Sequence, residues 1–434
     1  MQHIGNSAAA SPSCSPAPGR EMRAVTAALH DGDLATAPLV DLAGDVGRMF
    51  AHGRRGMVGF GVAAQVALEH SVDLLRSIEH IDLRDSDDRT GPGAGAVALG
   101  AIDFLPGAPN SLVIPSVLIA DDGHGHRCVT VVDDGTLDPQ VAVTTACAGL
   151  TRCSDPTPTS AAFAVAPAVD VAHYLAAVET ARDAVRDGVL EKAVIARPII
   201  VSSDQPMSVH AVLRRLENTF GNTYRFSIDG FVGASPELLV EVDNLTVRSR
   251  PLAGTTRTTG DPDRDARLAD ELMNSEKNRI EHHAAIEMVR NTLLPYCSYL
   301  DWTPRPSIVK VANVQHLGSQ AEGMLSEPPS TVADLVIALQ PTPAVGGHPR
   351  AAAIDLIVAN EGFDRGRYGG AVGWVDGNGD GVWAVSLRCA EFSDDRRSAR
   401  LVAGGGIVAD SDPLAELAET QAKLQAMLGA LIRP

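Results

Sequence analysis

The sequence predicts an α/β (α+β) fold in which large antiparallel β-sheets are packed in layers with helices outside. The first third of the chain consists of short apolar runs separated by Gly, Pro and Asp. Later segments have apolar residues at helical spacing, and two strand-like runs are joined by a short turn rich in Gly and Asp. Such an order is typical of layered sheets flanked by helices. No repeat of 20–50 residues occurs, which excludes a solenoid or propeller.

The composition indicates a globular protein with a large core. Of 434 residues, 45% are hydrophobic and 21% are charged, which excludes a disordered chain. The formal net charge is −18, so neither nucleic acid nor an anionic membrane is an expected partner. With no signal peptide and no run of ~18 apolar residues, we expect a cytoplasmic protein. The six cysteines form no CxxC pair and are expected to be reduced thiols.

The chain divides into three stretches. Residues 1–22 are rich in Ser, Ala and Pro and are expected to form a disordered tail. Residues 23–160 contain strand-like runs such as 111–120 and form the N-terminal, strand-rich part of the same fold. A stretch rich in Pro, Ser and Thr at 153–162 marks a soft boundary before the last region, 161–434.

The last region alternates helices and strands. Apolar residues recur at helical spacing after residue 170, and Gly188 ends this helix. The next elements are strands at 190–201, 225–234 and 238–242 and a long helical pattern from Leu268 to Leu294. They are followed by a hairpin of 369–376 and 381–392 joined by GNGD, a strand at 401–408, and a helix opened by Asp412 and Pro413 that runs to about Leu431.

Carboxylates on two predicted helices are candidates for holding a hard cation. Glu281 lies mid-helix, while Glu416 and Glu419 share one face of the last helix with Lys423. The spacing alone also fits a solvated, ion-paired face. A Gly-rich run leads into this helix, however, and exposed backbone N–H groups near a helix N-terminus can bind an anion. Carboxylates for a cation and N–H groups for an acid would then lie close together.

Three further charged residues are candidates for chemistry. Lys192 lies where apolar residues alternate along a predicted strand, and burial would favour the neutral amine, which can act as a general base. Glu237 follows a Ser-Pro turn at the start of a strand, where its carboxyl can point into a cleft. The alternatives are an edge lysine and an exposed turn acid. Arg388 stands within a predicted strand, and a buried arginine needs an acid or an anionic ligand nearby.

A series of motifs, taken together and in order, resembles the chorismate-utilising enzymes, and among them the isochorismate synthases of siderophore and menaquinone pathways most closely. The resemblance is strong over about 170–434 and faint at GAIDFLP (100–106). The motifs are KAVIAR (192–197), GASPELL (233–239), RPLAGT (250–255), EHH (281–283), QHLGS (315–319), PTPAVGG (341–347), FDRGRYGGAVGW (363–374), AVSLRCAE (384–391), AGGGIV (403–408) and AETQAKL (418–424).

The resemblance implies the fold of that family and a Mg²⁺-dependent isomerase. Water adds at C2 of chorismate while the C4 hydroxyl leaves, which gives isochorismate. By their positions in the motifs, Lys192 corresponds to the general base and Glu237 to the general acid. The implied magnesium ligands are Glu281, Glu419 and, through water, Glu416. The implied substrate-binding residues are Gly254, Thr255, Ala344, Tyr368, Arg388, Gly404, Gly406 and Lys423.

The family's branches differ at a few positions. Anthranilate synthases commonly carry Gln in place of Lys192, and aminodeoxychorismate synthases carry a nucleophilic Lys in place of Ala253. Both amination branches are excluded, so no glutamine amidotransferase subunit is expected. Salicylate synthases tend to carry Thr-Ala where Ala344 and Val345 stand, so the resemblance favours the branch that stops at isochorismate. The alternatives are a salicylate synthase, which also eliminates pyruvate, and an inactive chorismate-binding homologue.

Two residues depart from the family's pattern. Asn278 stands where relatives often have an acid, which lowers the negative charge expected around the metal. Gln340 precedes PTPA where relatives usually have His. Relatives of this branch are often monomers, and we expect a monomer here. The sequence leaves open whether the product serves a siderophore, menaquinone or salicylate.

Overall fold

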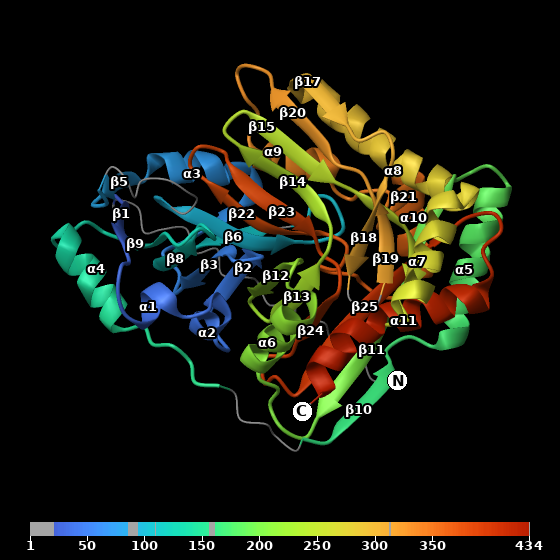
Figure 1. Ribbon diagram of the computed structural model, residues 1–434, viewed down its shortest axis with the longest axis horizontal. Helices are drawn as coiled ribbons and strands as arrows, with labels where there is room; N and C mark the ends of the chain where they lie inside the picture. Colours follow the sequence, from blue (N-terminus) through green and yellow to red (C-terminus); the bar gives the residue numbers. More distant parts are fainter. Residues whose placement is uncertain (1–20, 86–93, 109, 156–160, 312–313, 434) are drawn as a thin grey trace, which may run out of the picture.

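Two large β-sheets lie face to face at the centre of the structure, with helices around them (Figure 1). This computed structural model describes residues 21–85, 94–108, 110–155, 161–311 and 314–433, except for the side chains of Lys277 and Glu281. Nearly all of the predicted 1–22 tail therefore lies outside the described residues. The layered architecture agrees with the fold class expected from the sequence.

The first sheet has thirteen strands within the described residues. Its pairs are antiparallel except for β1 with β5. In spatial order it consists of β10 (Phe163–Pro167), β11 (Lys192–Ser203), β25 (Ser398–Ile407), β24 (Cys389–Phe392), β13 (Phe231–Ser235), β12 (Tyr224–Ile228), β2 (Arg48–His52), β3 (Arg55–Phe60), β8 (Val117–Asp121), β9 (Arg127–Asp133), β1 (Arg23–Ala28) and β5 (Glu79–Asp82), with β21 (Gly347–His348) beside β11.

The second sheet has nine strands in the described part of the chain, and a third, small sheet has three. The second sheet runs through β17 (Cys297–Trp302), β20 (Ala321–Leu325), β15 (Thr246–Arg250), β14 (Leu238–Asp243), β23 (Gly381–Val385), β22 (Ala371–Asp376), β6 (Val97–Ile102), β7 (Ser111–Ile114) and β4 (Ala64–Ala67). The third sheet consists of β16 (Leu252–Arg257), β19 (Val314–Gly318) and β18 (Ser307–Val311). Both large sheets combine strands from before and after residue 160.

The helices cover the outer faces and ends of the sheets (Figure 1). Helix α11 packs on β25, α5 on β11, α6 on β12 and β13, α9 on β14, and α7 and α8 on β16. The helices are α1 (Asp33–Thr36), α2 (Leu39–Ala43), α3 (Ser71–Ser77), α4 (Pro139–Ala148), α5 (Val171–Arg186), α6 (Val209–Phe220), α7 (Pro262–Asn274), α8 (Glu276–Leu293), α9 (Val332–Leu339), α10 (Arg350–Asn360) and α11 (Pro413–Ile432), with short 3₁₀ turns at Leu68–His70 and Leu294–Tyr296. No helix among the described residues is long and apolar enough to cross a membrane.

The core lies both between the sheets and beneath the helices. Phe226 of the first sheet and Leu99 and Trp374 of the second sheet belong to one buried cluster that joins the two layers. A second cluster packs Leu213 of α6 and Leu428 of α11 against the outer face of the first sheet. Burial of this much apolar surface is the main force that holds the layers together.

Two of the predicted strands pass from one sheet to the other, and a third is a hairpin. The run 381–392 is not one strand, because β23 lies in the second sheet and β24 in the first. The run 111–120 breaks in the same way, at Pro115. The run 225–234 is a hairpin whose turn residues, Asp229 and Gly230, have φ values of 46° and 76°. This Asp-Gly turn is a recognised hairpin signal. The predicted hairpin at GNGD, by contrast, is confirmed.

The prediction of one long helix from Leu268 to Leu294 is wrong in one respect, because two helices, α7 and α8, occupy this stretch. Ser275 lies between them with ψ 116°, outside the helical range, and its side chain caps α8 by accepting the N–H of Asn278. A serine that caps a new helix competes with continuation of the old one. The last helix begins as predicted, with Asp412 at the N-cap and Pro413 in the first turn.

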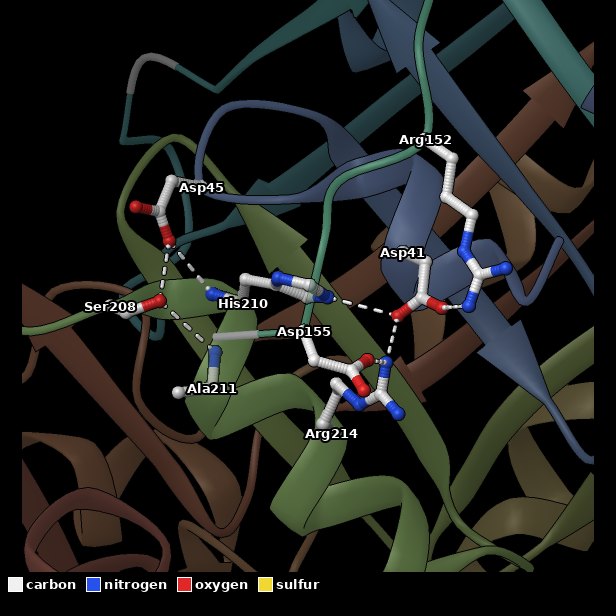
Figure 2. A network of polar contacts seen from close by, with 8 residues as sticks. All are labelled: Asp41, Asp45, Arg152, Asp155, Ser208, His210, Ala211 and Arg214. Atoms are coloured by element: carbon white, nitrogen blue, oxygen red, sulfur yellow. Dashed lines mark hydrogen bonds and ion pairs between the residues drawn. The ribbon is translucent and has the colours of Figure 1, made fainter. Parts of the chain in front are cut away.

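A polar network centred on the buried Asp41 ties α2, α6 and the segment before residue 156 together (Figure 2). The Asp41 carboxylate is fully buried. It accepts hydrogen bonds from Arg214 at 2.6 Å and Arg152 at 3.1 Å, and it contacts His210 Nε2 at 2.9 Å. Arg214 also bonds Asp155 at 2.7 Å. The network holds the end of the N-terminal region against the first sheet's helices.

Candidate active site

One cavity is lined by every predicted site residue whose side chain the structure describes. It contains about 870 Å³ of empty space, including its mouth, a size suited to a small molecule. The residues are Lys192, Glu237, Gly254, Thr255, Ala344, Tyr368, Arg388, Gly404, Gly406, Glu416, Glu419 and Lys423. The predicted metal ligand Glu281 lies on α8, but its side chain is outside the described residues. The roles of all these residues stay predictions.

Two adjacent strands and a helix form one wall of the cavity. β11 begins with the half-buried Lys192, and β25 lies antiparallel to it with Gly406 opposite Val194. The glycines of β25 leave space on this wall that side chains would fill. A Cβ at Gly404, for example, would lie 3.0 Å from a methyl group of Val194. Helix α11 follows β25 after a short turn and carries Glu416 and Glu419 to the same wall.

Glu237 and Arg388 lie where the chain passes from one large sheet to the other. Glu237 separates β13 from β14, and Arg388 separates β23 from β24. The two crossings are hydrogen-bonded to each other, since Val385 N–H donates to the Glu237 carbonyl and Ala234 N–H donates to the Arg388 carbonyl. The paired crossings therefore place one acidic side chain, Glu237, and one basic side chain, Arg388, where the two sheets meet.

Glu237 is in an environment that favours its protonated form. Its side chain is 2% exposed, and burial raises the pKa of its carboxyl to about 8. A hydrogen bond from the Leu252 backbone and the charges of Lys192 and Arg388 act in the opposite direction but do not cancel the effect of burial. A carboxylic acid that keeps its proton at neutral pH can serve as a general acid.

Arg388 is placed to bind an anion. The sequence predicted it within a strand, but its φ of 51° lies in the left-handed region and ends the strand. Such backbone strain is often found at functional sites. Desolvation lowers the pKa of its guanidinium, opposed by Tyr368, Glu419 and Glu237. Arg388 lines the cavity, where its guanidinium can donate hydrogen bonds to an anionic ligand.

The two carboxylates of α11 are oxygen donors of the kind that Mg²⁺ binds, but no third His, Cys, Asp or Glu completes a group with them among the described residues. Glu416 is buried, and one of its oxygens accepts a hydrogen bond from Ser411 at 2.8 Å. Glu419 forms an ion pair with Lys423 at 2.6 Å, and Lys423 also donates to the Gly404 carbonyl. A Cβ at Gly405 would approach Glu416 Oε2 to 2.7 Å, so the glycine leaves room for this carboxylate. Hard oxygen donors beside an open cavity are what Mg²⁺ prefers.

His316 is a cavity residue to which the sequence analysis gave no role. It is buried on β19 in the third sheet. Nδ1 lies 3.0 Å from Thr255 Oγ1 and 3.3 Å from the Gly254 carbonyl. Burial, with the charges of Arg388 and Lys423, lowers its pKa to about 3, so the ring is neutral. In the tautomer that donates from Nδ1 to the Gly254 carbonyl, Nε2 keeps its lone pair and can accept a hydrogen bond from a ligand hydroxyl.

The two departures from the family pattern have structural roles. Asn278 lies against Gly254, whose φ is 73° and where a Cβ would approach Asn278 Oδ1 to 3.1 Å. Gln340 is buried, and its Nε2 donates to the carbonyls of Asp103 and Phe104 at 2.7 and 3.2 Å. Asn278 thus borders the cavity directly, whereas Gln340 holds the 100–106 segment from behind.

Comparisons with known proteins show the family and the fold. The family model for chorismate binding enzymes matches residues 52–432. The chain is 38% identical over 365 residues to a provisionally named isochorismate synthase, MenF, of Mycobacterium tuberculosis, covering 81% of this chain and 91% of that protein. It is 39% identical to the isochorismate synthase DhbC of Bacillus subtilis over 62% of this chain and 70% of DhbC. The Escherichia coli menaquinone-specific isochorismate synthase MenF has a similar fold, with a TM-score of 0.79 at 23% identity, covering 94% of this chain and 95% of MenF.

Proposed function

Because this chain belongs to the family of chorismate-binding enzymes, we propose that its cavity converts chorismate into isochorismate. The observation that carries the proposal is that Lys192 and Glu237 line one cavity, together with Arg388. An isomerisation that moves a hydroxyl group needs a proton acceptor, a proton donor and an anion site. These three residues supply all three.

Lys192 and Glu237 have complementary tasks. Lys192 takes a proton from a water molecule while the water oxygen bonds to C2 of chorismate. The ring double bonds shift, the C4–oxygen bond breaks, and Glu237 gives its proton to the departing oxygen, which leaves as water. Water is added and water is lost, so the product is an isomer of the substrate. Exchange with solvent returns a proton to Glu237 and removes one from Lys192.

The remaining cavity residues bind and orient the substrate. Arg388, with Tyr368 and Lys423, holds the enolpyruvyl carboxylate, helped by the backbone at Gly404 and Gly406. Gly254, Thr255 and Ala344 form the wall against the ring. Fixed positions matter because placing reactants in a near-attack geometry supplies a large part of catalysis.

Glu416 and Glu419, with Glu281 of α8, would hold Mg²⁺. When bound, the cation neutralises the ring carboxylate of the substrate, which otherwise faces acidic residues. The protein's own contribution is to supply few carboxylates and leave room for water, as Mg²⁺ requires. We further propose that the enzyme acts as a monomer in the cytoplasm and needs no amidotransferase subunit, because water rather than ammonia is the nucleophile.

The function is tested by incubating the purified protein with chorismate and Mg²⁺ and separating the products by chromatography and mass. We expect a product of the same mass as chorismate but of different retention, absent with EDTA and in Lys192→Ala. Salicylate together with pyruvate would show that the enzyme goes on to eliminate pyruvate. Ala344 and Val345 would then not distinguish the enzymes that stop at isochorismate. Unchanged chorismate would identify an inactive homologue.

A further inference from the structure

A buried ion pair behind the cavity contacts two of the segments that form it. Glu361 and Arg365 are each 3% exposed. Glu361 Oε2 accepts from Arg365 Nε at 2.8 Å, and Oε1 accepts from Arg365 Nη2. Neither residue lines the cavity. The pair therefore has no direct access to a ligand, and any influence it has on the reaction passes through its neighbours.

The pair hydrogen-bonds three backbone groups of the cavity wall. Arg365 donates to the carbonyls of Val194 and Val345, each at 2.7 Å. Glu361 accepts the N–H of Ala196 at 2.7 Å. Val194 and Ala196 follow Lys192 on the same face of β11, and Val345 follows Ala344. One ion pair thus joins the strand of the proposed base to the wall of the proposed ring site.

These bonds replace a missing strand. On the edge of β11 that faces away from β25, β21 pairs with Lys192 and Ala193, and β10 pairs with residues 199–203. Neither strand pairs with Val194 or Ala196, which lie between these two stretches. The Val194 carbonyl accepts from Arg365, the Val194 N–H donates to the Gly346 carbonyl, and the Ala196 N–H donates to Glu361. Side chains therefore fix this part of β11 in the plane of the sheet, where a strand would otherwise do so.

The guanidinium is itself held from the N-terminal region. Arg365 lies 4.2 Å over the ring of Phe104 and 6.0 Å from that of Tyr368. Phe104 N–H donates to the Gly366 carbonyl, and Gln340 bonds the Phe104 carbonyl. This arrangement gives a structural role to the GAIDFLP motif, which the proposed mechanism does not use.

Stability alone is a weak reason for such a pair. Removing two charges from water is costly, and buried ion pairs can often be replaced by apolar residues without loss of stability. A guanidinium, however, offers five donors in a fixed plane, so it can bond a carboxylate and two carbonyls at once. Neither lysine nor an apolar side chain can reproduce that geometry.

We propose that Glu361 and Arg365 are positioning residues that fix β11, and with it Lys192, relative to the wall at Ala344 and Val345. The inference rests on the proposed function, because it takes Lys192 as the base. Loss of the pair lets β11 move against that wall while the anion-binding residues Arg388 and Lys423 stay in place. The proton-transfer step is then impaired more than substrate binding.

The test compares Arg365→Lys and the double variant Glu361→Gln/Arg365→Met with the wild type. We expect kcat to fall by about 10²-fold in the double variant and less in Arg365→Lys, because an error of ~1 Å in placement can cost that much. KM for chorismate should change by less than about threefold, the pattern of an interaction that matters only in the transition state. Thermal unfolding measures how far each variant remains folded.

Matched controls come from the Asp41 network, none of whose residues lines the cavity (Figure 2). Arg214→Lys and Asp41→Asn/Arg214→Met change a carboxylate that is equally buried and a guanidinium whose side chain is 32% exposed, on α2 and α6 rather than beside β11. They should lower the unfolding temperature and leave kcat unchanged. If kcat falls in proportion to the loss of unfolding temperature, and does so to the same extent in the control variants as in the Glu361 and Arg365 variants, the Glu361–Arg365 pair has only a structural role.

Amide hydrogen exchange gives a readout that does not depend on activity. In the double variant, exchange should rise in residues 192–198 and 343–347 and not in the rest of the first sheet. Unchanged exchange in these residues would overturn the inference, whether or not the wild type makes isochorismate. The proposed function is overturned by a different result, namely that the wild type makes no isochorismate. Raised exchange with wild-type kcat would show that Lys192 does not depend on the pair.

Discussion

Glu237 connects burial of one carboxyl to the pH dependence of the reaction. Its pKa is about 8 because the side chain is buried, so the acid is protonated below that pH and ionised above it. A general acid works only in its protonated form. We therefore expect kcat/KM to fall as pH rises through about 8. Glu237→Gln should lower kcat by about 10²–10⁴-fold, and whatever activity remains should lack this alkaline limb in a pH–rate profile.

The same carboxyl should make the protein less stable at alkaline pH. In the unfolded chain its pKa returns to 4.5, so the folded state holds a proton that the unfolded state has lost between about pH 4.5 and 8. Stability contributed by this group is full below pH 4.5 and lost as pH rises through 8. Glu237→Gln should then be more stable than the wild type at pH 8.5, by on the order of 5 kcal/mol, and equal to it near pH 4. Urea unfolding at the two pH values measures this, with Glu179→Gln on the exposed surface of α5 as a control that should show neither change.

What the sequence could predict at this scale depended on how each residue works. Lys192, Glu237 and Arg388 are charged groups inside apolar runs, and their motifs led to them directly. His316 was passed over because its chemistry depends on Gly254 and Arg388, which are distant in sequence and meet only in the fold. Glu361 and Arg365 are four residues apart and look like an ordinary helix-surface ion pair until burial is known.

At the scale of elements, strand pattern was predicted better than strand ends. The hairpin at GNGD and the final helix have local turn and cap residues and agree with the structure. The run 381–392 was taken for one strand because apolar residues continue through the break, and only the positive φ of Arg388 marks where the chain changes sheets. Periodicity reports which residues are buried, not which sheet they join.

The junction of β25 and α11 allows a prediction about the metal. In Gly405→Ala, the new methyl group would press on Glu416 Oε2, which is 2.7 Å from the Cβ position, and displace a proposed metal ligand. We expect the Mg²⁺ concentration for half-maximal activity to rise about 10-fold or more, as is usual when support of a metal ligand is lost, with kcat recovered at saturating Mg²⁺.

Gly429→Ala, farther along α11, is the matched control. A Cβ there meets only the end of Arg433, at 3.7 Å, so its Mg²⁺ dependence should equal that of the wild type, while the helix gains about 0.5–1 kcal/mol. Equal Mg²⁺ dependence of all three proteins would show that Glu416 takes no part in metal binding.

At the scale of the whole molecule, the two sheets create the site by exchanging strands. Because β13 continues into β14 and β23 into β24, Glu237 and Arg388 lie at the seam. All the predicted site residues come from the chain after residue 160, yet Phe104 from the N-terminal region supports Arg365. The sequence could predict layered sheets from its strand-rich pattern. It could not predict this exchange, because the order of strands in space is set by long-range pairing.

The acidity of the whole molecule leads to a last prediction. With a formal net charge of −18 and with Glu416 and Glu419 in the cavity wall, an anionic substrate is repelled unless a cation comes with it. Chorismate and Mg²⁺ should therefore bind cooperatively, each tightening the other by at least about fivefold, a coupling of ~1 kcal/mol. Calorimetric titration of Glu237→Gln, in which turnover is greatly slowed, measures chorismate affinity with and without Mg²⁺. The additional change Glu419→Gln should weaken Mg²⁺ binding and reduce this coupling, since it removes both a ligand and a repelling charge. Equal chorismate affinity with and without Mg²⁺ would show that Arg388 and Lys423 suffice to hold the substrate.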